Sequence, residues 1–206
     1  MSTPRRKLRK GAKPFTYTDQ GRFFHLQSAL LSSPMYPQHA EAFKIAADMI
    51  LDAHQSTERG PHHDTLVFPV LYLYRHCLEL RLKDLVMLGV RTGLFDLSEV
   101  EEMLGEHKLC PLWARAKKLI QDGYPDDDEA ATAESIINEF HRIDKHGQTL
   151  RYDRERRSLK LRRYESLPSH TSVLTLRSTM DDLYQYLDYC HAGILDWWDA
   201  SQQALA

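Results

Sequence analysis

The chain has 206 residues, of which 42% are hydrophobic and 27% are charged, and its formal net charge is -2. These values are ordinary for a globular protein, so they exclude a wholly disordered chain and, with nine glycines and nine prolines, a collagen-like one. The longest uncharged apolar run, residues 66–74, falls short of the ~20 residues of a membrane span, so we expect a cytoplasmic protein without membrane contact.

The charge is unevenly distributed along the chain. Residues 1–13 carry six Lys and Arg and no acid, residues 122–139 carry seven acids and no Lys or Arg, and residues 142–163 carry nine bases against three acids. We interpret residues 1–20 as a disordered basic arm with no secretory signal, and 21–206 as a single domain. The cluster at 142–163 either neutralises the phosphates of a nucleic acid or balances the acidic segment, within the chain or across a dimer.

Two long helices are predicted in the first half of the chain. Over residues 38–55, apolar residues recur at steps of three and four, which is typical of a helix with one buried face. That face comprises Ala42, Ile45, Ala46, Met49 and Ile50. A longer helix is predicted over 65–89, where Asp64 or Thr65 opens it and Gly89 closes it.

The second half is predicted to contain shorter helices, a basic insertion and a long final helix. Short helices are expected after residues 96–98, over 111–121 and over 126–143. The final helix, about 178–203, opens with a sequence similar to a capping box at Ser178. Its apolar stripe comprises Met180, Leu183, Leu187, Cys190, Ile194 and Trp198, so Trp197 either packs elsewhere or anchors a partner.

The insertion, about residues 148–177, alternates leucines with basic or polar residues. This alternation predicts either a short β-hairpin or an extended basic arm. The sequence as a whole therefore predicts an all-α bundle of four to six helices with one irregular basic insertion.

The helix predicted over 65–89 is apolar on most of its surface but carries one polar stripe of Arg75, His76, Glu79 and Lys83. Burying unpaired charge is expensive, so such a stripe needs partners or solvent. Two interpretations stay open. The stripe lines an active or binding site, or it is a ladder of charges spaced four residues apart on a solvent-exposed edge.

Three segments resemble HEPN-type domains. Residues 74–85, with Glu79 and Lys83 four apart on an apolar helix, resemble the second helix of these domains. Residues 105–109, followed by Leu112 and Trp113, resemble the entry to the next helix. Residues 140–144 and 150–152 resemble a segment of a bacterial branch of the HEPN superfamily. The resemblance covers about 65–155, together with the final helix.

The resemblance implies a bundle of four or five helices that forms a homodimer. Many members of this superfamily are metal-independent ribonucleases of toxin–antitoxin, CRISPR or anti-phage systems, and others are inactive partners or scaffolds. Active members carry Arg and His with four to six residues between them. Here Arg142 and His146 have three residues between them, and Pro168 lies between Arg163 and His170. Either the catalytic pair is degenerate, or this chain uses other groups, among which His107 is a further candidate.

The sequence therefore predicts a HEPN-like protein of a bacterial defence or toxin-type system that contacts RNA and is a candidate ribonuclease. The candidate catalytic residues are His76, Glu79, Lys83, Arg142 and His146. The candidate RNA-binding residues are Arg151, Arg154, Arg156, Arg157, Lys160, Arg162 and Arg163. The alternative is a non-catalytic dimeric module that docks on a protein of the same system. Three scattered cysteines do not make a zinc site, so neither a metal nor a cofactor is predicted.

Overall fold

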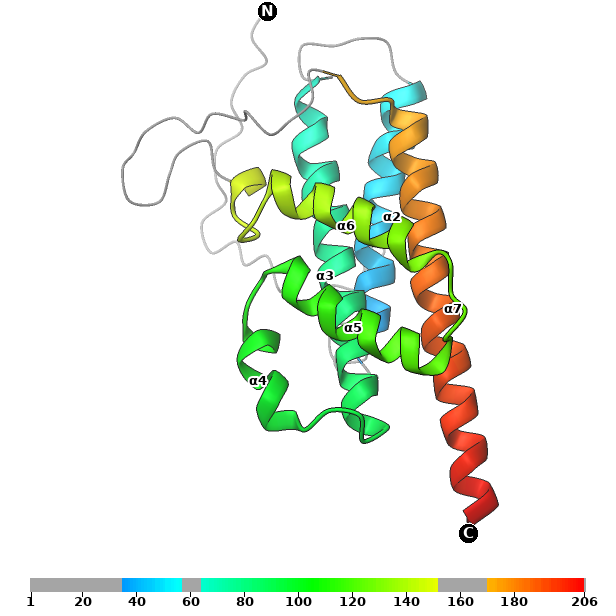
Figure 1. The fold of residues 1–206 in the computed structure, drawn as a ribbon. Coiled ribbons are helices and arrows are strands. Elements are labelled where there is room, and N and C mark those ends of the chain that lie inside the picture. Colours follow the sequence, from blue (N-terminus) through cyan, green and yellow to red (C-terminus); the bar gives the residue numbers. More distant parts are fainter. Residues whose placement is uncertain (1–34, 57–63, 152–169, 206) are drawn as a thin grey trace, which may run out of the picture. The chain divides into compact units, whose positions relative to one another are not determined.

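The structure, a computed structural model, describes residues 35–56, 64–151 and 170–205. Their elements are α2 (Met35–Ser56), η1 (Asp64–Leu66), α3 (Val67–Arg91), α4 (Leu97–Gly105), α5 (Leu109–Gly123), α6 (Ala130–Ile143), η2 (Thr149–Arg151) and α7 (Val173–Leu205). Here η denotes a short 3-10 helix. The described ranges contain no strand, so the all-α prediction is confirmed (Figure 1).

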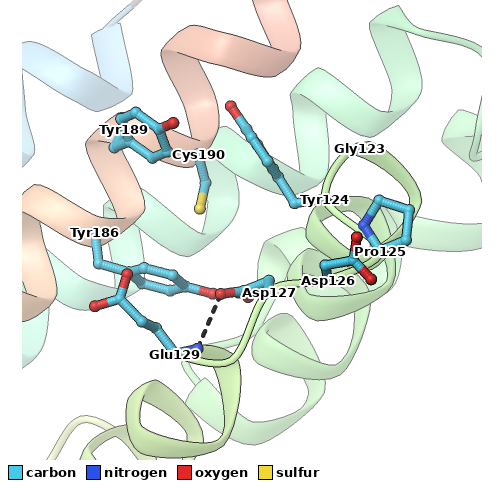
Figure 2. A pocket seen from close by; sticks show the side chains of 9 residues that line it. All are labelled: Gly123, Tyr124, Pro125, Asp126, Asp127, Glu129, Tyr186, Tyr189 and Cys190. Carbon is cyan, nitrogen blue, oxygen red and sulfur yellow. Dashed lines mark hydrogen bonds between the residues drawn. The ribbon is translucent and has the colours of Figure 1, made fainter.

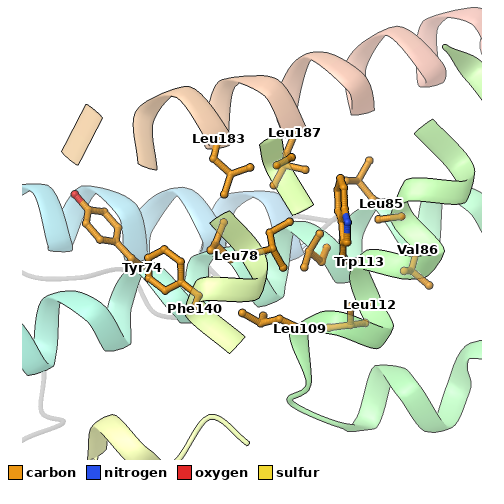
Figure 3. Close-up of a cluster of buried hydrophobic side chains, with 14 of the residues drawn as sticks. Tyr74, Leu78, Leu85, Val86, Leu109, Leu112, Trp113, Phe140, Leu183 and Leu187 are labelled. Carbon is orange, nitrogen blue, oxygen red and sulfur yellow. The ribbon is translucent and has the colours of Figure 1, made fainter. Parts of the chain in front are cut away.

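Helix α3 is the centre of the fold. It contacts α2, α4, α5, α7 and η2, and Figure 1 shows α2, α3 and α7 side by side. Its apolar residues meet side chains from α5, α6 and α7 in one core; Figure 3 shows Leu78 and Leu85 of α3 among Leu109, Leu112, Trp113, Phe140, Leu183 and Leu187. Leu78 is fully buried, and removing a buried leucine side chain costs about 2–5 kcal/mol.

The C-terminus of α3 differs from the predicted one. The helix continues past Gly89 to Arg91, and the left-handed residue that follows it is Gly93, with φ of 80°. Gly89 has another role, since a Cβ there would lie 2.4 Å from the ring of Phe95. The glycine at 89 therefore lets Phe95 pack on the helix, and the glycine at 93 ends it.

Helix α2 turns a different face inward from the one predicted. Ile45 and Met49 are 50% and 66% exposed, and the buried residues are Ala40, Ala47 and Leu51. The reason is tertiary: Asp48, on the inward side, accepts a hydrogen bond of 2.6 Å from the hydroxyl of buried Tyr74. Periodicity identified the helix correctly, and Ile50 of the predicted face packs against the core, but Ala42, Ile45 and Met49 of that face are exposed.

Helix α7 begins at Val173, earlier than predicted. The N–H of Thr175 donates to Oγ of Ser172 over 3.2 Å, so Ser172 is the capping residue. Ser178 lies within the helix instead, where its hydroxyl donates to the carbonyl of Thr175. The alternation of leucines over 174–177 is therefore helical and not extended, and residues 152–169 of the predicted insertion lie outside the described ranges.

The predicted apolar stripe of α7 is confirmed from Met180 to Ile194, where all five residues are buried. Trp198 continues the stripe and packs beneath the guanidinium of Arg91, whose Cζ lies 4.7 Å from the ring centroid. Trp197 is 68% exposed, as expected when one of the two lies on the stripe.

No helix in the described ranges is both long and apolar enough to cross a membrane.

Candidate functional site

Glu79, on the central helix, is the hub of a buried ionic network. Helix α3 places Arg75 and Lys83 one turn before and after it, so that both cations reach the same carboxylate. Arg75 Nη1 lies 3.2 Å from Glu79 Oε2, and Lys83 Nζ lies 2.9 Å from Oε1. The Glu79 side chain is only 2% exposed, and the two cations are buried with it. The ladder predicted from the sequence therefore exists, but it lies inside the protein and not on a solvent-exposed edge.

Two imidazoles connect this buried carboxylate to the surface. Nδ1 of His107 lies 2.8 Å from Oε1 of Glu79, and the His107 side chain is 52% exposed. Nδ1 of His76 lies 3.8 Å from Oε2, and this ring is partly buried. A carboxylate bonded to one ring nitrogen fixes the orientation of the imidazole and leaves the other nitrogen for a substrate. The pair of Glu79 and His107 therefore has the geometry of an acid–base group.

The electrostatic environment keeps Glu79 ionised. Burial by itself raises the pKa of a carboxyl group, but the nearby ring of His76 and the hydrogen bonds with His107 and Lys83 outweigh burial and lower the pKa of Glu79 below its ordinary value. The carboxylate is therefore charged throughout the physiological pH range.

Arg75 joins this network to two backbone segments. Its Nε donates to the carbonyl oxygen of Asp144 over 2.9 Å, and its Nη2 donates to the carbonyl oxygen of His107. With Nη1 on Glu79, every nitrogen of the guanidinium has a partner. Arg75 thus fixes both the segment that carries His107 and the end of α6 relative to Glu79.

The turn after α6 packs tightly against the site. The carboxylate of Asp144 accepts the backbone N–H groups of Gln148, Thr149 and Leu150. Burial alone would raise the pKa of Asp144, but these bonds and the charge of Arg75 lower it. At Gly147, with φ of 69°, a Cβ would lie 3.0 Å from Arg75 Nη1 and 3.2 Å from His107 Cβ. A side chain at this position would push the turn off the site.

The structure brings together only part of the predicted catalytic set. His76, Glu79 and Lys83 converge as expected. Arg142 does not join them, because its guanidinium is 65% exposed and pairs with Glu139 of its own helix at 3.7 Å. His146 is exposed on the turn next to Gly147, so it lies beside the site without contacting Glu79.

Of the predicted RNA-binding residues, the described ranges include Arg151 and leave Arg154, Arg156, Arg157, Lys160, Arg162 and Arg163 outside. Cζ of Arg151 lies 5.5 Å from the ring centroid of Tyr72. The Tyr72 ring is parallel to His76, with 6.0 Å between centroids and 3° between planes. The guanidinium of Arg151, the ring of Tyr72 and the ring of His76 therefore lie in a row that ends next to Glu79.

A second ionic network on α3 had no place in the sequence interpretation. Arg81 lies 3.3 Å from Asp84 on the same helix and 2.5 Å from Asp188 on α7, and Nε2 of His191 lies 3.2 Å from Asp84. The sequence does contain two charged pairs spaced three residues apart, Arg81 with Asp84 and Asp188 with His191. It does not show that α3 and α7 contact each other, which is what joins the two pairs into one network.

The described residues contain no group of three or more His, Cys, Asp or Glu placed to hold a metal ion. Cys77, Cys110 and Cys190 are free thiols. The thiol of Cys110 donates to Oδ1 of Asn138 over 3.2 Å.

Fold and site together define a class: an all-α protein whose central helix carries a buried carboxylate and two buried cations. Two imidazoles that reach the surface lie near that carboxylate, His76 from the same helix and His107 from the segment between α4 and α5. Comparison of the chain with family models, with curated proteins and with solved structures finds no match. The resemblance to HEPN-type domains therefore rests on the sequence segments themselves and stays a prediction.

Proposed function

We propose that the chain is a HEPN-like, RNA-contacting protein of a bacterial defence or toxin-type system and that it cleaves RNA without a metal ion. The observation that carries this proposal is the half-exposed imidazole of His107 on the buried, ionised carboxylate of Glu79. General acid–base groups of this kind accelerate a reaction by about 10²–10⁴-fold. Metal-independent cleavage of RNA uses such groups to move the protons of the reaction, together with cations that stabilise the charge on the phosphate.

In the proposed reaction the ribose 2′-oxygen attacks the adjacent phosphorus. Nε2 of His107 takes the 2′-hydroxyl proton as the new O–P bond forms. The P–O5′ bond breaks, and His76, the other imidazole near Glu79, donates a proton to the leaving oxygen. The products are a 2′,3′-cyclic phosphate and a free 5′-hydroxyl.

The surroundings of the pair support contact with RNA. Lys145 and His146 are exposed on the turn that packs against His107, and Arg151 lies over Tyr72 at the start of the segment rich in arginine. Cations bind phosphates, and planar side chains stack on unpaired bases. A single-stranded RNA that contacts Arg151 and this turn would have its backbone near His107.

The test compares wild-type protein with His107→Asn on total RNA in EDTA. We expect cleavage to 2′,3′-cyclic phosphate ends by the wild type and a loss of about 10²-fold or more in the variant. His191→Asn is the matched control, because His191 also contacts a carboxylate of α3 but lies in the second network. Cleavage that needs added Mg²⁺, or equal rates in all three proteins, would contradict the proposal.

RNA contact is tested separately through its salt dependence. Neutralising three bases of the predicted set, R154A/R156A/R157A, should reduce the slope of log K against log salt by about 2, since each phosphate contact on a single strand contributes ~0.7. An unchanged slope would exclude these arginines from the RNA contact.

The alternative is a non-catalytic dimeric module, and one observation favours it: the exposed apolar face of α2 around Ile45 and Met49. Apolar side chains exposed together on one helix are typical of an interface. Two results together would support the scaffold function. Analytical ultracentrifugation should show a dimer for the wild type and a monomer for I45E/M49E, and neither protein should cleave RNA.

A further inference from the structure

A cavity of about 310 Å³ lies between the C-terminal end of α5, the loop to α6 and the middle of α7. Its lining combines tyrosines and acids: Tyr124, Tyr186, Tyr189, Asp126, Asp127 and Glu129. None of these belongs to the Glu79 network. Figure 2 shows the three aromatic rings around this space, with the sulfur of Cys190 between Tyr186 and Tyr189.

The tyrosines supply aromatic faces and a fixed hydroxyl. The rings of Tyr124 and Tyr189 lie 5.8 Å apart with a tilt of 33°, and Tyr189 is 68% exposed at the surface. The hydroxyl of Tyr186 donates to Oδ2 of Asp127 over 2.6 Å. The faces of such rings attract cations, most strongly where water is partly excluded.

Among the residues that the structure describes, the carboxylates of the pocket have no cation to balance them. Across 35–56, 64–151 and 170–205, no Lys or Arg forms an ion pair with Asp126, Asp127 or Glu129. Asp127 is held in place, because its Oδ1 accepts the N–H of Glu129 over 3.0 Å while Oδ2 accepts the Tyr186 hydroxyl. Figure 2 shows Asp126 and Glu129 on different sides of Asp127, so negative charge is spread along the pocket.

Two glycines allow α5, α7 and Tyr124 to pack closely at this pocket. A Cβ at Gly193 would lie 1.9 Å from the hydroxyl oxygen of Tyr124, and a Cβ at Gly123 would lie 2.8 Å from Ile194. The bare backbone of α7 at residue 193 therefore lets the Tyr124 ring stand against the helix. The wall of the cavity depends on close packing and not on the position of a loose surface side chain.

We propose that this pocket binds a polyamine, a linear aliphatic chain with two or more ammonium groups. The tyrosine faces contact the methylene groups and the ammonium groups, and the separated carboxylates pair with more than one positive charge. The volume is at the lower end of the range for small-molecule sites, which fits a slender aliphatic chain. Inorganic cations lack the methylene groups that pack on the rings.

The experiment is isothermal titration with spermidine, at an ionic strength held constant with NaCl, on the full chain. We expect one site per chain, weakened about tenfold or more by Tyr189→Ala, which removes an exposed aromatic face and leaves the core intact. Asp127→Asn should weaken binding as much. The matched control, Glu102→Gln, neutralises an exposed acid on α4 and should bind like the wild type.

Three results would overturn the proposal. No heat or thermal shift with millimolar spermidine would exclude a polyamine site. Equal weakening by Asp127→Asn and Glu102→Gln would mean that spermidine binds the net charge of the surface. Equal binding of choline or Mg²⁺ at matched ionic strength would mean that the pocket does not recognise a chain of several ammonium groups.

Discussion

Replacing Glu79 by glutamine tests whether the buried network is as tightly coupled as its geometry indicates. The substitution keeps the size of the side chain but removes the negative charge that Arg75 and Lys83 share. Both cations are nearly inaccessible to solvent, so water cannot take the place of the carboxylate. Two buried positive charges, now 3.2 Å and 2.9 Å from the carboxylate oxygens, would then face a neutral amide.

The expected cost follows from that burial. Removing one partner of a buried ion pair costs about 3–5 kcal/mol of the free energy of unfolding. Because the amide of glutamine keeps some hydrogen bonds, we expect a loss of about 3 kcal/mol for this variant. For a chain of this size, 1 kcal/mol shifts the melting temperature by about 2–4 °C. We therefore expect Glu79→Gln to melt about 6–12 °C below the wild type.

The assay is urea unfolding at pH 7 with thermal melts as a second measurement, and Glu99→Gln is the control. Glu99 pairs with Arg115 at 3.6 Å on the surface, so its loss should cost about 1 kcal/mol or less. In a double-mutant cycle with Lys83→Met, the two losses should sum to more than the loss in the double variant. Equal, small effects of Glu79→Gln and Glu99→Gln would refute the buried-network reasoning.

Three further predictions concern the turn, the cavity wall and pH. Asp144→Asn weakens the acceptor of three backbone N–H groups and should cost about 2–3 kcal/mol in urea unfolding, whereas a loss below 0.5 kcal/mol would contradict this role. Gly193→Ala places a methyl group against Tyr124 and should cost about 1–3 kcal/mol; an unchanged melting temperature would mean that the ring moves freely. The pKa values of Glu79 and Asp144 are lowered in the folded state, so their contribution is complete above their ordinary values of 4.5 and 3.8 and is lost as pH falls through the folded values. The free energy of unfolding of the wild type should therefore decrease more between pH 7 and pH 3 than that of Glu79→Gln. Equal decreases would contradict a lowered pKa of Glu79 in the folded state.

The stripe of Glu79 shows where sequence reasoning stops. Spacing placed Arg75, Glu79 and Lys83 on one face of an apolar helix, and the structure has them there. Spacing could not decide between a solvent-exposed edge and a buried site, because burial depends on what the rest of the chain packs against that face. His107 reaches Glu79 from 28 residues away in sequence, and no local pattern encodes such a contact.

Helices α7 and α2 show when the buried face of a helix can be predicted from the sequence and when it cannot. The stripe of α7 has large apolar residues on one face and polar ones elsewhere, so its buried side follows from the sequence. Helix α2 has small alanines on one side and Ile45 and Met49 on another. Close packing on α3 favours the small residues, and the hydrogen bond between Tyr74 and Asp48 fixes that orientation.

By itself, the sequence determined the helical class, the positions of the helices and the charge on each segment, since these depend on local propensity and periodicity. Only the tertiary structure decided which face of α2 is buried, that Arg142 stays apart from Glu79, and that three tyrosines and three acids line one open pocket. Those properties depend on contacts between residues far apart in the chain. Such contacts form through packing and pairing, whose partners no single stretch of sequence specifies.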